Sequence, residues 1–213
     1  MLFFRPEERD RTLFPHDPFK GLIVPRPIGW VSTMSQAGEV NLAPYSYFNA
    51  FSSSPMIVGF SSEGEKDSAT FAVESGEFAW SMATWPLREQ MNASAAPLAR
   101  GESEFAHAGL ETAPSRLIRP PRVAASPAAL ECKVTQVVKL KGVGGDDLSR
   151  TLVLGQVVGL HIDERCVKNG RVDAVAMQAI ARCGYDEYTV IERVFSMARP
   201  TGGGNAFGGR EAG

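Results

Sequence analysis

Prolines and glycines interrupt this sequence so often that no apolar run continues for long, and this spacing restricts the fold more than any other feature. The chain of 213 residues contains 14 prolines and 21 glycines. The apolar runs at residues 28–34, 56–61 and 77–84 are short, rich in β-branched and aromatic residues, and bounded by turn-forming residues. Because few segments show a helical period, the sequence predicts a mainly β protein with a barrel core.

Two longer strands are predicted at residues 129–140 and 151–162, joined by a glycine-rich hairpin loop. Between the short runs and these strands, residues 101–127 form a long loop that holds four prolines. Such a connection is longer than most connections in compact domains. We therefore expect this loop to do more than join two strands.

Two or three short helices complete the predicted fold. One runs from Lys66 to Gly76, with Asp67 or Ser68 as its N-cap. A second follows Thr84, whose side chain can cap it. The length predicts one domain over residues 1–200, and residues 201–213 are predicted to be a flexible glycine-rich tail.

Composition and charge exclude several classes of protein. The formal net charge is -2 and no run is rich in lysine or arginine, so binding to nucleic acid is not expected. No apolar stretch is long enough to cross a membrane, and the first ten residues lack the pattern of a secretion signal. The cysteines Cys132, Cys166 and Cys183 are odd in number and widely spaced, which indicates free thiols and a cytoplasmic location.

Familiar catalytic motifs are absent from the sequence. We find no GxGxxG turn, no P-loop, no GxSxG and no HExxH. The histidines His16, His107 and His161 lie far apart in the chain and have no carboxylates at ligand spacing, so no metal site is predicted.

The segment from residue 25 to residue 68 carries the most chemical information. Small hydroxyl and amide side chains alternate there with aromatic ones. This mixture suits a planar heteroaromatic ligand with a phosphate tail, because ring faces need apolar walls and ring edges need fixed donors and acceptors. The alternative is a serine-rich loop with a hydrophobic strand on each side.

An ordered series of motifs resembles the flavin-reductase-like, FMN-binding split-barrel family. The two longest matches are PRPIGWVST at residues 25–33 and NLAPYSYFN at residues 41–49. Shorter matches follow in order at residues 55–61, 66–68, 114–116, 129–134, 155–161 and 182–185. The resemblance implies a six-stranded antiparallel Greek-key split barrel, a homodimer, FMN rather than FAD, and NAD(P)H as co-substrate.

The start of the helix at Lys66 is the predicted phosphate site. A helix N-terminus offers unpaired N–H groups and a favourable dipole to an anion. Lys66 supplies a cation, and hydroxyl groups of Ser61, Ser62 and Ser68 can donate hydrogen bonds. We expect Asp67 to cap the helix or to orient Lys66.

The resemblance places the remaining cofactor residues around the flavin ring and ribityl chain. Asn41 and Asn49 can alternatively satisfy turn backbone, and Trp30 and Phe48 can be plain core. The predicted ring and ribityl contacts are Pro27, Ser32, Thr33, Asn41, Ser46, Phe48, Asn49 and Arg182.

Two further positions have an open interpretation. His161 follows Gly155 and Gly159, which are expected to share its face and to leave room for nicotinamide or the flavin edge; the alternative is a surface histidine. At residues 182–185 the family's usual glycine pair is replaced by Cys183-Gly184, which makes the backbone there less permissive.

The function implied by the resemblance is that of a flavin reductase, in which hydride passes from NAD(P)H to flavin N5. The cofactor carries this chemistry, so no catalytic residue is assigned. The electrons would pass to free flavin, oxygen, or a partner monooxygenase or redox protein. The alternatives are a flavoredoxin-like electron-transfer protein without its own nicotinamide site, and a barrel that binds a ligand without being an enzyme.

Overall fold

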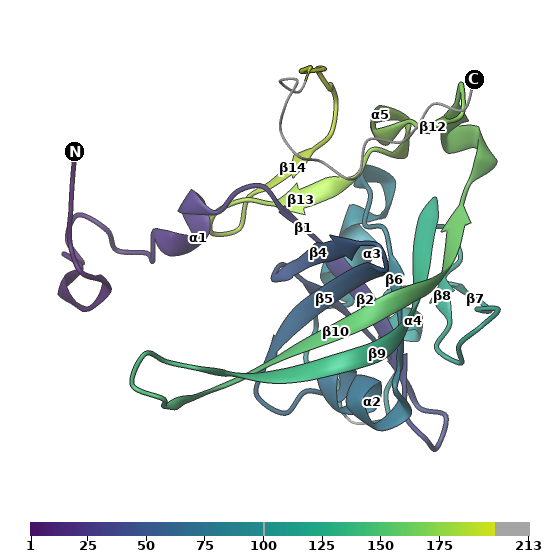
Figure 1. The fold of residues 1–213 in the computed structure, drawn as a ribbon, viewed down its shortest axis with the longest axis horizontal. Coiled ribbons are helices and arrows are strands. Elements are labelled where there is room, and N and C mark those ends of the chain that lie inside the picture. The colour runs from purple at the N-terminus through teal and green to yellow at the C-terminus, as the bar shows by residue number, and fades with distance from the viewer. Residues whose placement is uncertain (100, 199–213) are drawn as a thin grey trace.

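The structure is a computed structural model that describes residues 1–99 and 101–198. Within them, seven strands form one antiparallel sheet in the order β3-β2-β6-β9-β10-β5-β4. The sheet curls until β3 contacts β5, which forms the barrel in Figure 1. Its strands are β2 (Gly29–Met34), β3 (Val40–Tyr45), β4 (Phe48–Ser53), β5 (Met56–Glu63), β6 (Glu77–Ser81), β9 (Ala128–Lys141) and β10 (Asp147–Ile162).

The strands form where the short runs were predicted, because side chains on both sheet faces are buried. On the inner face, Val31, Phe60 and Phe78 belong to one core cluster. On the outer face, Trp30 and Leu42 belong to a second cluster that segments after β6 cover. Burial on both faces explains why β2 is apolar or small at almost every position rather than alternating.

Short helices close and cover the barrel. Helix α2 contacts β2, β3, β6, β9 and β10 at the lower opening in Figure 1. Its N-cap is Lys66 rather than Asp67 or Ser68, and no side chain caps it; Gly76 ends it at a φ of 72°. The α-helices are α1 (Phe19–Leu22), α2 (Asp67–Ser75), α3 (Arg88–Ala93), α4 (Glu104–His107) and α5 (Ala174–Met177), and the 3-10 helices are η1 (Pro6–Glu8), η2 (Trp85–Leu87) and η3 (Glu164–Cys166).

Three small antiparallel sheets flank the barrel. The largest has the order β1-β13-β14 and lies beside the N-terminal segment in Figure 1. The other two are the pairs β7–β8 and β11–β12. The strands are β1 (Arg26–Pro27), β13 (Ile180–Arg182), β14 (Tyr188–Val190), β7 (Thr112–Ala113), β8 (Arg122–Val123), β11 (Val167–Lys168) and β12 (Arg171–Val172).

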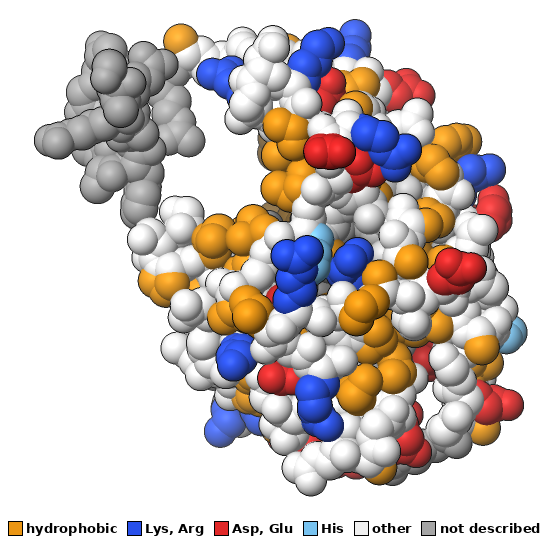
Figure 2. All heavy atoms as spheres, turned by 90° about the vertical axis from the view of Figure 1, so that its right-hand side faces the viewer, with side chains coloured by type: hydrophobic (Ala, Val, Ile, Leu, Met, Phe, Trp, Pro, Cys, Tyr) orange, Lys and Arg blue, Asp and Glu red, His pale blue; other side chains and the backbone are white. Residues whose placement is uncertain are grey.

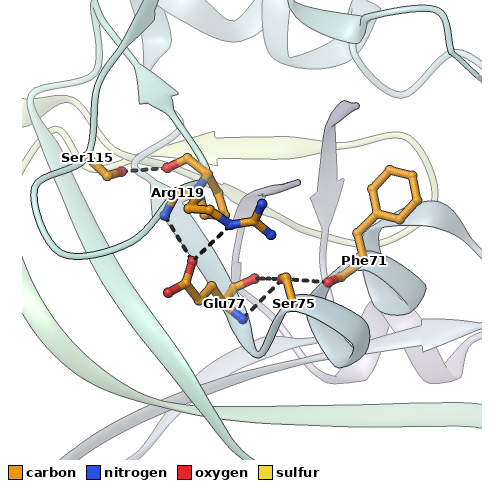
Figure 3. Close-up of polar contacts among 6 residues, drawn as sticks. Phe71, Ser75, Glu77, Ser115 and Arg119 are labelled. Carbon is orange, nitrogen blue, oxygen red and sulfur yellow. Dashed lines mark hydrogen bonds and ion pairs between the residues drawn. The ribbon is translucent and has the colours of Figure 1, made fainter. Parts of the chain in front are cut away.

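The proline-rich segment at residues 101–127 contains α4, β7 and β8 and is tied to the barrel. The backbone N–H of Arg119 donates to Glu77 Oε2 at 2.9 Å, at the start of β6. Ser115 Oγ donates to the carbonyl of Pro120 at 2.6 Å, and Ser75 Oγ donates to the carbonyl of Phe71 (Figure 3). The bond between Arg119 and Glu77 ties the segment to the start of β6, next to the end of α2.

A β-bulge in β10 changes which glycines share a face with His161. Val157 pairs with Cys132 while Gly159 pairs with Glu131, so one residue of β10 is extra. A Cβ on Gly155 would meet the Phe78 ring inside the barrel, whereas one on Gly159 would meet Glu131 on the outside. The expectation that Gly155 and Gly159 share one face is therefore wrong, and the space at Gly155 belongs to Phe78.

Replacing Gly155 by alanine is expected to lower the free energy of unfolding by about 2 kcal/mol, because a buried site with no room must overpack. The new Cβ would collide with Cε1 of the Phe78 ring and would lie 3.2 Å from Cys132 Cβ. Urea unfolding measures the loss. Gly144→Ala, in the hairpin loop where the nearest atom is 3.4 Å away, is the control, and equal stability of both variants would contradict the packing described.

The mainly β, antiparallel fold class is confirmed, with seven strands in the main sheet of the described residues instead of six. The tail predicted at residues 201–213 lies outside the described residues. Among the described helices, none has the length and apolar character that a membrane crossing requires.

Candidate functional site

A groove of about 440 Å³ opens between the start of α2, the edge strand β3 and the chain that follows α3. It brings together three residues that the sequence singled out: Asn41, Lys66 and Ser68. Strand β3 has a strand neighbour on one side only, so part of its backbone faces this groove. The volume is within the range of small-molecule sites.

A buried polar network fixes Asn41 at the floor of the groove. Its Nδ2 donates to Glu104 Oε1 at 2.8 Å, and its Oδ1 accepts from Ser68 Oγ. The second oxygen of Glu104 accepts the backbone N–H of Leu42 at 3.0 Å. Glu104 in α4 thus holds the edge of β3 and one side of the Asn41 amide. The second N–H of that amide has no acceptor among the residues that the structure describes.

Tyr45 extends the same network toward the inside of the barrel. Burial raises the pKa of its phenol, although Ser68 and Ser62 lie within hydrogen-bonding reach and oppose the rise; the charge of Glu104 adds to it. The hydroxyl therefore remains neutral at physiological pH. It keeps a proton that can be donated within the network.

The first turn of α2 has the properties of an anion site. No side chain caps the helix. Among the described residues, the backbone N–H groups of Asp67, Ser68 and Ala69 have no acceptor, and Thr70 supplies the first backbone hydrogen bond of the helix. The Lys66 side chain is exposed beside them. These unpaired donors and the cation fit a phosphate, as FMN would bring to this groove.

Three predicted hydroxyls are buried at different places around the barrel. Thr33 pairs with Asn41 across β2 and β3, and its hydroxyl has no hydrogen-bond partner within the described residues. Ser32 lies on the opposite face with Trp30, also without a partner in that part of the chain. Ser62 lies on the inner face near Tyr45, whereas alternation along β5 turns Ser61 to the other face. Thr33 and Ser62 thus share the inner face with Asn41 and Tyr45, whereas Ser32 and Ser61 point to the other face.

The other predicted contacts lie outside the groove. Phe48 is buried and stacks on Trp80, with ring centroids 5.7 Å apart. Asn49 is exposed, and its Oδ1 accepts the backbone N–H of Ala50 at 2.8 Å. Ser46 is half-buried in the turn after β3, and Pro27 is exposed in β1.

Arg182 projects from β13 toward a different cleft. Its guanidinium donates to Tyr188 Oη and to the carbonyl of Tyr185. The cleft that it lines is formed with α3, not with α2. In one chain, Arg182 and Lys66 therefore belong to separate cavities.

His161 lies in a pocket of about 610 Å³ at the C-terminal end of β10, which two arginines and two carboxylates line. Its Nε2 is 2.5 Å from Glu131 Oε1. Arg116 and Arg122 line the same pocket. Figure 2 shows a histidine between basic side chains on the face turned toward the viewer.

The side chain of Glu131 forms part of the wall of this pocket. The backbone N–H groups of Arg116 and Leu117 donate to its two oxygens at 2.7 and 2.6 Å. Burial alone would raise the pKa of the Glu131 carboxyl, but the hydrogen bonds from His161, Arg116 and Leu117 outweigh burial and lower it. Glu131 therefore stays ionised and anchors the proline-rich segment.

No sequence motif singled out Glu104 or Glu131 as a functional residue. Both are acidic residues with at most 8% of their surface exposed. A glutamate flanked by apolar residues, as in Leu130-Glu131-Cys132, is the signal that could have found one of them, since a buried carboxylate needs donors around it. Nothing comparable marks Glu104, whose partners are more than sixty residues away in the chain.

Comparison with known proteins agrees with this architecture. The family model described as flavin reductase like domain matches residues 21–175. An uncharacterised protein of Halalkalibacterium halodurans is 36% identical over 186 residues, which cover 85% of this chain and 88% of that protein.

Two solved structures share the fold over almost their whole length. Nitrilotriacetate monooxygenase component B from Bacillus cereus matches with a TM-score of 0.84 and 29% identity, covering 92% of this chain and 98% of the other. A candidate flavin reductase with a split barrel domain from Shewanella frigidimarina matches with a TM-score of 0.82 and 19% identity, covering 94% and 100%. The split barrel predicted from the motifs is confirmed. Because the family model covers most of the sequence, this chain belongs to the flavin reductase-like family.

Proposed function

We propose that this chain binds FMN in the α2 groove and acts as an oxidoreductase that takes hydride from NADH or NADPH. The observation that carries the proposal is the uncapped start of α2 beside Lys66, on a groove edged by Asn41. The bound flavin would accept the hydride. The chain's own residues bind and orient it, and we assign no acid or base.

Within this proposal, Lys66 and the first N–H groups of α2 hold the phosphate, and Asn41 offers its remaining N–H to the ribityl or ring edge. Ser68 holds Asn41 by donating to its Oδ1, and Ser62 lies beside Tyr45. Contacts from Pro27, Ser32, Thr33, Ser46, Phe48, Asn49, Ser61 and Arg182 remain predictions.

Partners and location complete the proposal. A homodimer is favoured by the N-terminal segment, which projects from the barrel in Figure 1 with exposed Leu2, Phe3 and Phe19. A partner monooxygenase is suggested by the likeness to the Bacillus cereus component B. The three cysteines are free thiols, as a cytoplasmic protein would have.

An absorption spectrum followed by anaerobic mixing with NADH and NADPH tests the function. We expect a yellow protein, or one that FMN makes yellow, whose flavin band bleaches with at least one nucleotide. Bound flavin without bleaching would favour the electron-transfer alternative. A colourless protein that FMN cannot reconstitute would exclude both flavin functions.

Replacing Lys66 by alanine is expected to raise the dissociation constant of FMN about tenfold, because one charge-assisted contact to phosphate is lost. Fluorescence quenching of FMN measures the constant. Lys168→Ala, an exposed lysine in β11, is the control. Unchanged FMN affinity in Lys66→Ala would show that the phosphate lies elsewhere.

A further inference from the structure

A second cleft, of about 740 Å³, opens between α3 and the hairpin of β13 and β14. Each wall carries an arginine stacked on an aromatic ring. The guanidinium carbon of Arg88 lies 4.0 Å from the ring centroid of Trp85, and that of Arg182 lies 4.4 Å from the centroid of Tyr188. A guanidinium held flat in this way is a cationic platform on which a heteroaromatic base can stack.

Three carboxylates, Glu89, Asp186 and Glu192, also line the cleft. Asp186 and Glu192 form no ion pair with any residue of the described part of the chain, whereas Glu89 lies 3.4 Å from Arg88. Unpaired carboxylates in a cleft are acceptors for neutral donors such as sugar hydroxyls, and they repel a second anion. The cleft therefore suits the base and the ribose of a nucleotide. The arginines lie close to the position of a phosphate attached to that ribose.

The cleft and the α2 groove are neighbours. Asn92 in α3 lines the cleft, and Ser94, the C-cap of the same helix, lines the groove. Residues two apart lie on opposite sides of a helix, so the two cavities are separated by about one helix diameter, roughly 10–12 Å. Two riboses and a pyrophosphate can bridge such a separation.

We propose that this cleft binds the adenosine end of the nicotinamide dinucleotide and selects NADH over NADPH; this inference rests on the proposed function. Adenine stacks on the guanidinium of Arg88, which Trp85 holds flat. Asp186 and Glu192 accept hydrogen bonds from the adenosine ribose. A 2′-phosphate at the same ribose would face these carboxylates, as acidic residues face the ribose in other NADH-specific sites.

Calorimetric titration of the FMN-loaded protein with AMP and with adenosine 2′,5′-bisphosphate tests the cleft without any flavin chemistry. AMP is expected to bind about tenfold more tightly than the bisphosphate, a difference of about 1.4 kcal/mol. Trp85→Ala is expected to weaken AMP binding about tenfold. The double variant Asp186→Asn, Glu192→Gln is expected to bring the two dissociation constants within about threefold of each other.

Controls separate the possible failures. Trp85 is half-exposed. The control variant is Glu164→Gln, in η3 and outside the cleft, which is expected to bind AMP as the wild type does. Arg88→Gln serves as a second cleft variant if urea unfolding shows that Trp85→Ala is unstable. No AMP binding in the wild type, unchanged binding in both cleft variants, or tighter binding of the bisphosphate would each overturn the inference.

The same preparations are mixed anaerobically with NADH and NADPH. Normal bleaching without AMP binding would overturn the cleft assignment and leave the reductase function standing. AMP binding without bleaching by either nucleotide would overturn the reductase function, because the nucleotide would then bind for another purpose.

Discussion

Replacing Glu131 by alanine is expected to lower the free energy of unfolding by about 4 kcal/mol, because removing a buried carboxylate leaves its hydrogen-bond donors without an acceptor. The carboxylate is 1% exposed and accepts from the backbone of Arg116 and Leu117 and from His161. All three would lose their partner at once. Urea unfolding at neutral pH measures the effect, with Glu164→Gln as the control variant.

Because the pKa of Glu131 is lowered in the folded state, the stability of the protein depends on pH. A carboxyl whose pKa is lower in the folded state stabilises the fold above its ordinary value of 4.5, and this contribution is lost as the pH falls through the folded pKa. We therefore expect the stability of the wild type to fall below about pH 4.5 more steeply than that of Glu131→Gln. Parallel curves for the two proteins would show that this carboxyl does not titrate with unfolding.

Replacing Glu104 by alanine is expected to cost about 3 kcal/mol of stability and to weaken FMN binding at the same time. Both oxygens of this buried carboxylate are used, one by Asn41 Nδ2 and one by the backbone of Leu42. Hydrogen bonds to a charged group contribute about 1.5–3 kcal/mol each. Without Glu104, the Asn41 amide can rotate and the edge of β3 loosens, so the floor of the groove loses its shape.

The conservative variant Glu104→Gln separates positioning from stability. It keeps the size of the side chain and one acceptor oxygen but removes the charge. We expect it to recover most of the stability while FMN affinity, measured by fluorescence quenching, stays below that of the wild type. Glu102→Gln, an exposed neighbour, is the control. Normal FMN affinity in Glu104→Ala would show that the groove does not depend on this network.

Local signals predicted three of the residues that line the candidate groove. Lys66, Ser68 and Asn41 were chosen from a helix start and a motif, and the structure brings them to one groove. The prediction for Phe48 and Asn49 left open a structural role, and both have one here: Phe48 stacks on Trp80 and Asn49 satisfies backbone. Single positions within a strand were harder, because neighbouring residues such as Ser61 and Ser62 point to opposite faces.

Contacts between residues far apart in the chain could not be predicted from sequence patterns. The bulge that separates Gly155 from Gly159 lies in the pairing of β10 with β9, beyond Gln156, where the pairing with β5 ends. No residue pattern within β10 predicts it. The partners of Glu104 are likewise distant in the chain. A carboxylate's environment depends on which donors the fold brings to it, not on its neighbours in sequence.

By itself, the sequence determined the β-rich class, the start and end of α2 to within a residue or two, and the family, since turns, apolar runs and motifs are local properties of the chain. Tertiary structure alone decided which hydroxyls share a cavity, that Arg182 faces α3 instead of α2, and that two buried glutamates hold the segments around them. The physical reason is that strands far apart in the chain together set the pairing register and the burial of each residue. A shift of one residue in the register turns a side chain from one face of the sheet to the other.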